Sequence, residues 1–222
     1  MSKKLNAVLY HNIFSPPSRM AYLTVKNLDI DIEIRDLDIF GGDQNKPEFL
    51  KLNIMHQVPT LVHDDFVVTE ARAIMIYLAT VAESPLYTLK DIRKKTLIES
   101  RLFFDATNAS LAVKNFIFPI VRKGVKTVSP MHREGLKTLL QNLEILLQTS
   151  EYFAGNELTI ADFGFLANVA TIKALGAELS VFPKLNAWYE KCSKLPGAKE
   201  NEDGAKFIAE RVKNLLNEPT WI

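Results

Sequence analysis

Residues 7–34 read AVLYHNIFSPPSRMAYLTVKNLDIDIEI and contain a strand signal, a helix signal and a second strand signal. The apolar run at residues 7–10 has the length of a buried strand, and residues 30–34 alternate between apolar and acidic side chains, as in a strand with one buried face. Between them, Ser15 precedes two prolines and then apolar side chains at helical spacing, so we expect a helix with Ser15 as its N-cap. Strand, helix and strand within about thirty residues predict a βαβ unit with a parallel strand pair.

The chain from residue 40 to residue 84 continues this α/β pattern. A polar stretch at residues 40–46 leads into Pro47, which is expected to open a short helix. The apolar runs at residues 59–62 and 66–68 flank a polar turn and predict a β-hairpin, and an apolar stripe at helical spacing follows it. The first part of the chain is therefore expected to be a compact βαβ–ββα unit.

Strand signals stop near Pro85, and the rest of the sequence predicts helices. We therefore place a domain boundary within residues 84–90, which divides the chain into an α/β domain at residues 1–84 and an all-helical domain at residues 90–222. Pro119 is expected to kink its helix. The predicted helices lie near residues 91–123, 132–149, 159–175, 183–195 and 204–216.

Composition and charge narrow the function. Of the 222 residues, 47% are hydrophobic and the formal net charge is +1, which excludes a disordered chain and disfavours nucleic-acid binding through a broad basic face. Cys192 is the only cysteine, so an intrachain disulfide framework is excluded and a cytoplasmic location is expected. The sequence has neither the apolar run of a signal peptide nor an uncharged stretch of membrane-spanning length, so no membrane association is expected. With a net charge near zero, we expect small-molecule or protein partners and no nucleic acid.

With these elements, the sequence resembles the cytosolic glutathione S-transferases over essentially its whole length. The resemblance rests on the βαβ–ββα order, on Val58-Pro59 before the third strand, and on Thr159 and Asp162, whose spacing predicts a capping box in the helical part. Three further segments are most similar to the insect delta and epsilon classes, with epsilon the better match. They are residues 15–17, 101–105 and 182–189. The family implies a thioredoxin-like N-terminal domain followed by an all-α C-terminal domain, which is the glutathione transferase fold.

The resemblance implies that glutathione is the co-substrate and that no metal is needed. A free thiol has a pKa of about 8.5, so only a small fraction of glutathione is nucleophilic thiolate at neutral pH. A hydroxyl donor beside the sulfur, helped by the positive end of a helix dipole, stabilises the thiolate. Ser15 is the expected catalytic donor, although the hydroxyls of Tyr10, Ser18 and Tyr22 stay open as alternatives, as does a purely capping role for Ser15.

The family also implies where the cysteinyl and γ-glutamyl parts of glutathione bind. Pro59 is expected in the cis form, so that the backbone of Val58 pairs with the cysteinyl part. Glu70 is expected to bind the γ-glutamyl ammonium, while the helix N-terminus beside it binds the carboxylate. The family has a serine where this chain has Ala71, so one hydroxyl donor is missing and weaker binding is expected.

Four further polar residues are candidates for the two carboxylate ends of glutathione. Arg72 and Asp105 match a charge network near the γ-glutamyl end in some delta-class relatives, and a structural ion pair is an equally good interpretation. Gln44 and His56 match epsilon-class positions near the glycine carboxylate.

The electrophile is expected to bind in a hydrophobic pocket between the two domains. Aromatic side chains at helical spacing more often belong to a core, so core and pocket both stay open for these residues. The pocket candidates are Ile13, Phe14, Phe116, Phe118 and Phe207.

The predicted activity is conjugation of glutathione to hydrophobic electrophiles, with detoxification as the default role in the family. An isomerase or dehydrohalogenase activity and a biosynthetic role on an endogenous lipid or steroid stay open, as does a non-catalytic transferase-like ligand-binding protein. A homodimer is expected, with an interface formed by the helix that starts at Glu70 and by the helix around Arg101.

Overall fold

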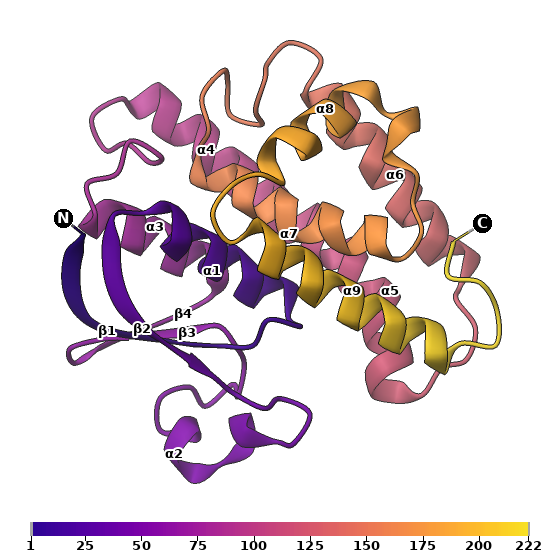
Figure 1. The fold of residues 1–222 in the computed structure, drawn as a ribbon, viewed down its shortest axis with the longest axis horizontal. Helices are drawn as coiled ribbons and strands as arrows, with labels where there is room; N and C mark the ends of the chain where they lie inside the picture. Colours follow the sequence, from indigo (N-terminus) through magenta and orange to yellow (C-terminus); the bar gives the residue numbers. More distant parts are fainter. Residues whose placement is uncertain (1, 222) are drawn as a thin grey trace.

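The computed structural model describes residues 2–221, and within them a mixed sheet of four strands forms one layer of the molecule (Figure 1). The strands are β1 (Lys3–His11), β2 (Ile30–Asp36), β3 (Thr60–His63) and β4 (Phe66–Thr69), in the order β2-β1-β3-β4. β1 pairs with β2 in parallel and with β3 antiparallel, and β3 and β4 form an antiparallel hairpin. The parallel pair and the hairpin predicted from the sequence are confirmed.

Helices lie on both sides of this sheet (Figure 1). α1 (Pro16–Asn27) and α3 (Ala71–Val81) pack against each other on one side, and the short α2 (Pro47–Leu50) lies on the other. Leu23 of α1 and Leu78 of α3 are fully buried with Leu9 of β1. Full burial of such a side chain contributes about 1.5–3 kcal/mol relative to an exposed one, so these contacts fix α1 and α3 on the sheet.

The chain after α3 is helical. α7 lies among the other helices, and all its residues from 160 to 172 are buried, as expected for a helix that is apolar on every side. Helix content and order agree with the predicted all-α part. The helices are α4 (Ile92–Phe104), α5 (Ser110–Lys123), α6 (Pro130–Leu146), α7 (Ile160–Ala174), α8 (Pro183–Cys192) and α9 (Ala198–Leu215).

Asp162 has the structural role that the sequence predicts. Its Oδ2 accepts a hydrogen bond of 2.9 Å from the backbone N–H of Thr159, the N-cap of α7. Its Oδ1 accepts hydrogen bonds from the Trp188 indole at 3.0 Å and from the Phe153 N–H at 3.1 Å. The buried carboxylate is therefore fully used in joining α7 to α8 and to the preceding loop.

The helix predicted for residues 91–123 is wrong in one respect. The structure divides it into α4 and α5 by a π-helical turn at Asp105–Ala109. α5 continues through Pro119 to Lys123, so the proline lies inside a helix, and the kink expected there stays a prediction. Such turns insert one extra residue and often occur at functional sites, and this one contains the candidate residue Asp105.

Arg19 of α1 connects the sheet layer to the helices. Its side chain is fully buried and donates hydrogen bonds to Asn201 Oδ1 in α9 at 2.9 Å and to the carbonyl oxygens of Ala167 in α7 and Ile13 at 3.1 and 3.2 Å. Burial lowers the pKa of Arg19 to about 9, so the side chain is still a cation at neutral pH. A Cβ on Gly204 of α9 would lie 2.2 Å from the Ile13 carbonyl oxygen, so only glycine allows this approach.

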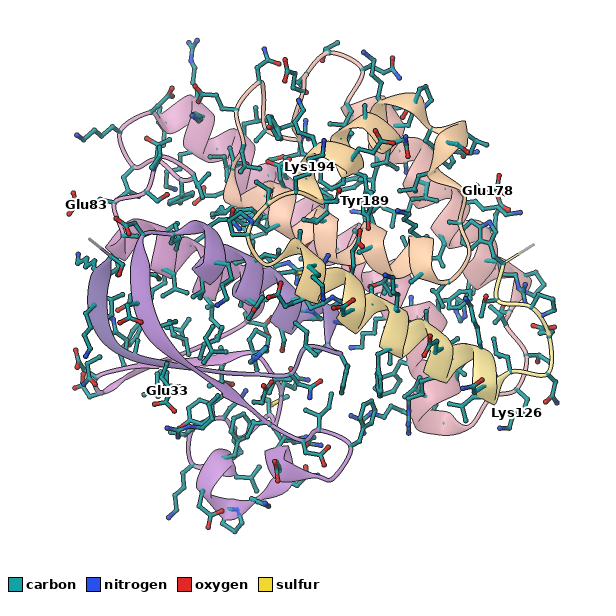
Figure 2. The ribbon with its side chains drawn as sticks, viewed as in Figure 1. Glu33, Glu83, Lys126, Glu178, Tyr189 and Lys194 are labelled. Atoms are coloured by element: carbon teal, nitrogen blue, oxygen red, sulfur yellow. The ribbon has the colours of Figure 1, made fainter. Side chains whose placement is uncertain are left out.

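Tyr189 adds a second connection among the helices (Figure 2). Its hydroxyl donates to Glu202 Oε1 of α9 at 2.9 Å, and Lys173 Nζ of α7 lies 4.4 Å from the centre of its ring. α9 is thereby held against α7 and α8.

Among residues 2–221, no helix combines the length and the apolar character that a bilayer crossing requires.

Candidate active site

A cavity of about 800 Å³ lies between the sheet layer and the helices. Its walls come from both parts of the molecule, so neither part forms the site alone. On one side the lining side chains come from residues 14–17, 39–40, 44–45, 53, 55–59 and 69–72, and on the other side they come from the π turn and α5, together with Asn168 and Ile208.

Ser15 is the N-cap of α1 and lines the cavity with a partly buried side chain. Its hydroxyl makes no capping hydrogen bond. Pro16 and Pro17 occupy the first two positions of the helix and have no N–H to offer a ligand. The Ser15 hydroxyl is therefore a free donor at the positive end of a helix.

The other hydroxyls near Ser15 do not line the cavity. The Tyr10 hydroxyl accepts a hydrogen bond from Arg35 at 2.9 Å. Ser18 is fully buried, and the Tyr22 ring stacks on His11 with a distance of 5.5 Å between ring centres. Of these four hydroxyls, the structure brings only that of Ser15 to the cavity.

Asn12 positions the loop that carries Ser15. Its Oδ1 accepts from the Phe14 N–H and its carbonyl oxygen from the Ser15 N–H, both at 3.0 Å. Its Nδ2 donates to the Leu37 carbonyl oxygen at 2.8 Å. Asn12 was not predicted from the sequence, although asparagine is a usual first residue of turns in which a side chain accepts from the backbone N–H two residues on.

The Val58–Pro59 peptide bond is cis, and both residues line the cavity. Asn53 fixes this segment, because its Nδ2 donates to the Gln57 carbonyl oxygen and to Thr60 Oγ1, each at 3.0 Å. His56 also lines the cavity, with a φ of 45° that is unusual for a residue other than glycine. The predicted backbone contact point is therefore held in a defined conformation.

Glu70 has an unusual backbone conformation at the start of α3. Its φ is 70° and its ψ is 116°, and such strained residues often occur at ligand sites. The first backbone hydrogen bond of α3 runs from Ile74 N–H to the Glu70 carbonyl, so the N–H groups of residues 71–73 have no partner within the helix. Ala71 is buried and lines the cavity beside them. The arrangement suits a ligand carboxylate at the helix N-terminus with a cation near Glu70.

Arg72 lines the cavity, whereas Asp105 lies behind it and is fully buried. The Arg72 Nε donates to Asp105 Oδ2 at 2.9 Å, and its Nη2 donates to Asp105 and to Ser110 Oγ. Asn168 Nδ2 donates to the other oxygen of Asp105 at 2.7 Å. Burial raises the pKa of Asp105, and Arg72 acts in the opposite direction. This network joins α3, the π turn, α5 and α7.

Gln44 lies in a short 3₁₀ helix at Asp43–Asn45 and lines the cavity. Its Nε2 donates to the Ile39 carbonyl oxygen at 3.1 Å. Its Oε1 is buried without a hydrogen-bond partner in the described part of the chain. The amide is therefore only partly satisfied by the protein, which is typical of a group that contacts a ligand.

The five candidates for the hydrophobic pocket divide into two groups. Phe14 and Phe118 line the cavity, but Ile13, Phe116 and Phe207 are not among the lining side chains. Phe116 is 1% exposed and belongs to the core. The Phe207 ring stacks on Phe14 with 3.7 Å between ring centres, so it supports the wall from outside.

Most of the apolar wall was missed from the sequence. These side chains come from the loop after β2, from α5 and from α9, and no local motif marks them. They are Ile39, Phe40, Leu111, Val113, Ile117, Val121 and Ile208.

Cys192 does not line this cavity. Cys192 is 1% exposed, and burial raises the pKa of its thiol, so it is a core residue and not a nucleophile. No group of three histidine, cysteine or acidic side chains that could hold a metal ion occurs within residues 2–221.

Comparison with known proteins agrees with this combination of fold and cavity. Residues 6–80 match the glutathione S-transferase N-terminal domain and residues 115–216 match a glutathione S-transferase C-terminal domain. Glutathione S-transferase D6 of Drosophila melanogaster is 34% identical over 215 residues, covering 94% of this chain and 99% of the relative. The chain therefore belongs to the glutathione S-transferase family: it is a glutathione transferase, and glutathione is its co-substrate.

Solved structures of two insect classes are similar to this chain. A delta-class glutathione transferase of Nilaparvata lugens has a TM-score of 0.88 and 33% identity, covering 94% of this chain and 99% of that one. An epsilon-class enzyme from the housefly, Musca domestica, has a TM-score of 0.89 and 31% identity, covering 95% and 98%. The TM-scores and the sequence identities of the two structures are nearly equal, so the assignment of this chain to the epsilon class stays a prediction.

Proposed function

We propose that Ser15 is the catalytic residue that donates a hydrogen bond to the sulfur of glutathione and favours its thiolate. The observation that carries this proposal is the Ser15 hydroxyl, which lines the cavity at the N-terminus of α1 and makes no capping bond. The thiol proton passes to solvent, and the thiolate forms a sulfur–carbon bond with the electrophile. In a substitution, the electron pair of the broken bond leaves with the departing group.

Glutathione is proposed to lie along the sheet side of the cavity. Its cysteinyl part pairs with the backbone of Val58 beside the cis Pro59, and its γ-glutamyl carboxylate binds the N-terminus of α3, with Glu70 on the ammonium. Arg72, held by Asp105, adds positive charge at that end. The glycine carboxylate is proposed to lie near Gln44 and His56, both of which line the cavity.

The hydrophobic electrophile is proposed to bind in the part of the cavity between the Ser15 loop and α5. Phe14 and Phe118 contact it directly there, because both line the cavity. Ile13, Phe116 and Phe207 are proposed to act from behind. Ile13 fixes the Ser15 loop through its carbonyl bond with Arg19, Phe116 anchors α5, and Phe207 stacks on Phe14.

Two measurements test this function together. The folded protein should be retained on immobilised glutathione and should conjugate glutathione to an aryl halide such as chlorodinitrobenzene, followed by the absorbance of the product. Retention without turnover would point to a ligand-binding protein. A folded preparation that shows neither property would contradict the proposed function.

We also propose a homodimer with the two cavities facing the groove between subunits. Apolar side chains stand exposed away from the cavity on β4 and α4, where Phe66 and Phe103 are examples with 52% and 70% exposure. Burial of such side chains against a second copy would stabilise a dimer. Sedimentation should give twice the chain mass of 25.1 kDa, and a stable monomer at micromolar concentration would contradict it.

The division into domains at residues 1–84 and 90–222, the cytoplasmic location and the role in detoxification are further proposals. The first is supported by the segment between α3 and α4, which has neither helix nor strand up to Asp91. The second is supported by Cys192, the only cysteine of the chain, which is a free and buried thiol.

A further inference from the structure

The charged and titratable side chains of the cavity are divided unequally between its two ends. Glu70 and His56 lie at the end proposed for glutathione, where Arg72 is bound to a buried carboxylate. The charged side chains of α5 that line the cavity are those of Lys114 and Arg122. Glu70 is the only acidic residue that lines the cavity within residues 2–221. The electrophile end therefore combines apolar walls with cationic groups alone.

Lys114 and Arg122 lie on the same face of α5 as Phe118. Successive spacings of four residues place the three side chains in one row along the helix, and all three line the cavity as exposed residues. The Lys114 Nζ lies 5.9 Å from the centre of the Phe118 ring. One bound molecule can therefore contact the aromatic ring and reach a cation at the cavity mouth.

A third cation lies beside the opposite wall. The guanidinium carbon of Arg211 in α9 is 4.4 Å from the centre of the Phe40 ring, which lines the cavity. Phe40 in turn packs against Phe14, the residue before Ser15, with 5.9 Å between ring centres. Positive charge thus flanks both sides of the apolar space.

These three cations have no acidic partner in the described part of the chain. No carboxylate oxygen lies within 4.0 Å of Lys114, Arg122 or Arg211, whereas other surface cations such as Lys94 and Lys199 form ion pairs. The net charge of the whole chain is only +1, so the local excess does not reflect a generally basic protein. Cations at the mouth of an apolar, low-dielectric space attract an anionic group of a ligand.

We propose that the electrophile end selects amphipathic anions, namely hydrophobic electrophiles that carry a carboxylate at the end remote from the reacting carbon. The carboxylate is attracted by the positive charges of Lys114 and Arg122 at the exposed side of α5, and the hydrocarbon part lies against Phe118 and the apolar wall. This inference rests on the proposed transferase function. A linear α,β-unsaturated aldehyde with a terminal carboxylate, as formed from an oxidised fatty acid, has the required chemistry.

The reaction of such a substrate balances without a further reactant. The glutathione thiolate forms a sulfur–carbon bond at the β-carbon while the carbon–carbon π bond breaks. The electron pair moves to the carbonyl oxygen as an enolate, and the α-carbon then takes a proton from water, which replaces the proton lost by the thiol. No group leaves, and nothing is oxidised or reduced.

A matched pair of substrates tests the proposal. The value of kcat/KM is measured for two linear α,β-unsaturated aldehydes of equal length, one ending in a methyl group and one in a carboxylate, and each is divided by its uncatalysed rate constant with glutathione. The double variant Lys114→Gln/Arg122→Gln should lower the carboxylate-to-methyl ratio about three- to tenfold. In the unaltered protein the ratio should fall similarly at about 1 M salt, where the Debye length is about 3 Å.

Lys123→Gln is the control, because Lys123 is the neighbouring exposed cation of α5 and does not line the cavity. It should leave the ratio unchanged. An equal fall of the carboxylate-to-methyl ratio in Lys123→Gln would show that the positive charge of the whole surface attracts the carboxylate, and this would overturn the proposal. An unchanged ratio in the double variant would overturn it as well.

A binding measurement without glutathione separates this site from the transferase function. Dodecanoate should displace the neutral probe Nile red from the unaltered protein more strongly than dodecanol, and the double variant should lose that preference. A protein with this preference that conjugates neither the aldehydes nor an aryl halide would keep the anion site and lose the proposed function. A protein that conjugates an aryl halide but prefers neither ligand would keep the function and lose the site.

Discussion

The end of the cavity proposed for glutathione is formed largely by backbone in unusual conformations, whereas the end proposed for the electrophile is formed by side chains on helix and loop surfaces. Glu70 and His56 at the first end have φ values of 70° and 45°. At the second end, Phe118 and Phe40 remain 42% and 36% exposed. A backbone site is fixed by the fold and suits a constant co-substrate, while surface side chains can differ without disturbing the fold. Substitutions should therefore have large effects at the first end and small effects at the second.

Asp105→Ala should have the largest effect, because Asp105 lies beneath the glutathione end. The substitution leaves Arg72 and Asn168 without their common acceptor in a buried position. Loss of one partner of a buried ion pair costs about 3–5 kcal/mol, so the free energy of unfolding should fall by about that amount. Urea unfolding measures it.

Asp203→Ala is the matched control, because Asp203 forms an exposed ion pair with Lys199 on α9. It should leave the midpoint of urea unfolding unchanged. Equal effects of the two substitutions would mean that the Arg72 network does not fix the glutathione end.

Ser15→Ala should lower kcat about ten- to a hundredfold, because a hydrogen bond to a charged group contributes about 1.5–3 kcal/mol. Affinity for glutathione should change much less, since the hydroxyl acts on the charged sulfur. The pKa of the bound thiol should rise, which ultraviolet titration of the thiolate detects. Ser18→Ala is the control, because this neighbouring hydroxyl is buried and does not line the cavity. An unaltered thiol pKa in Ser15→Ala would leave Ser15 as a simple helix cap.

Ala71→Ser should tighten glutathione binding by up to roughly tenfold. The added hydroxyl can donate to the γ-glutamyl carboxylate, and such a bond contributes about 1.5–3 kcal/mol, of which water already supplies part. The rate at saturating glutathione should stay nearly the same, because this end is bound alike in ground and transition states. Calorimetry measures the affinity for glutathione of this variant and of the control Ala73→Ser, which changes an exposed alanine of α3 outside the cavity. Equal affinities of the two variants would contradict the assignment of the γ-glutamyl site.

The sequence predicts the two-part architecture well because its local signals agree with the final packing. The alternation at residues 30–34 and the Thr159 to Asp162 spacing each correspond to the observed element. The π turn at Asp105–Ala109 was not predictable in this way, since its neighbours on both sides have ordinary helical patterns. Its first residue, Asp105, forms an ion pair with Arg72 of α3, a tertiary contact that no local pattern marks.

The same distinction explains which of the cavity-lining residues could be proposed from the sequence. Residues of the glutathione end sit in local motifs, a proline pair after Ser15 and Val58-Pro59, so they can be proposed from sequence. No local sequence motif marks the apolar wall proposed for the electrophile. Its helical residues differ from core residues only in the direction in which each side chain leaves the helix. Phe116 shares a face of α5 with the buried Ile120, whereas residues two positions apart, such as Phe116 and Phe118, point in very different directions.

Phe118→Ala should have the smallest effect and tests the electrophile end directly. The ring is 42% exposed and is one of many apolar contacts, so its loss should lower kcat/KM for a neutral aryl halide by about threefold, well below the value of a fully buried ring. The free energy of unfolding should hardly change. Phe116→Leu provides the counterpart on the same helix: it should lower the free energy of unfolding by about 1 kcal/mol and leave kcat/KM as it was, because Phe116 faces the core. If Phe118→Ala instead destabilised the protein, or lowered kcat/KM as strongly as Ser15→Ala, the electrophile end would be as rigidly specified as the glutathione end, and the contrast between them would not hold.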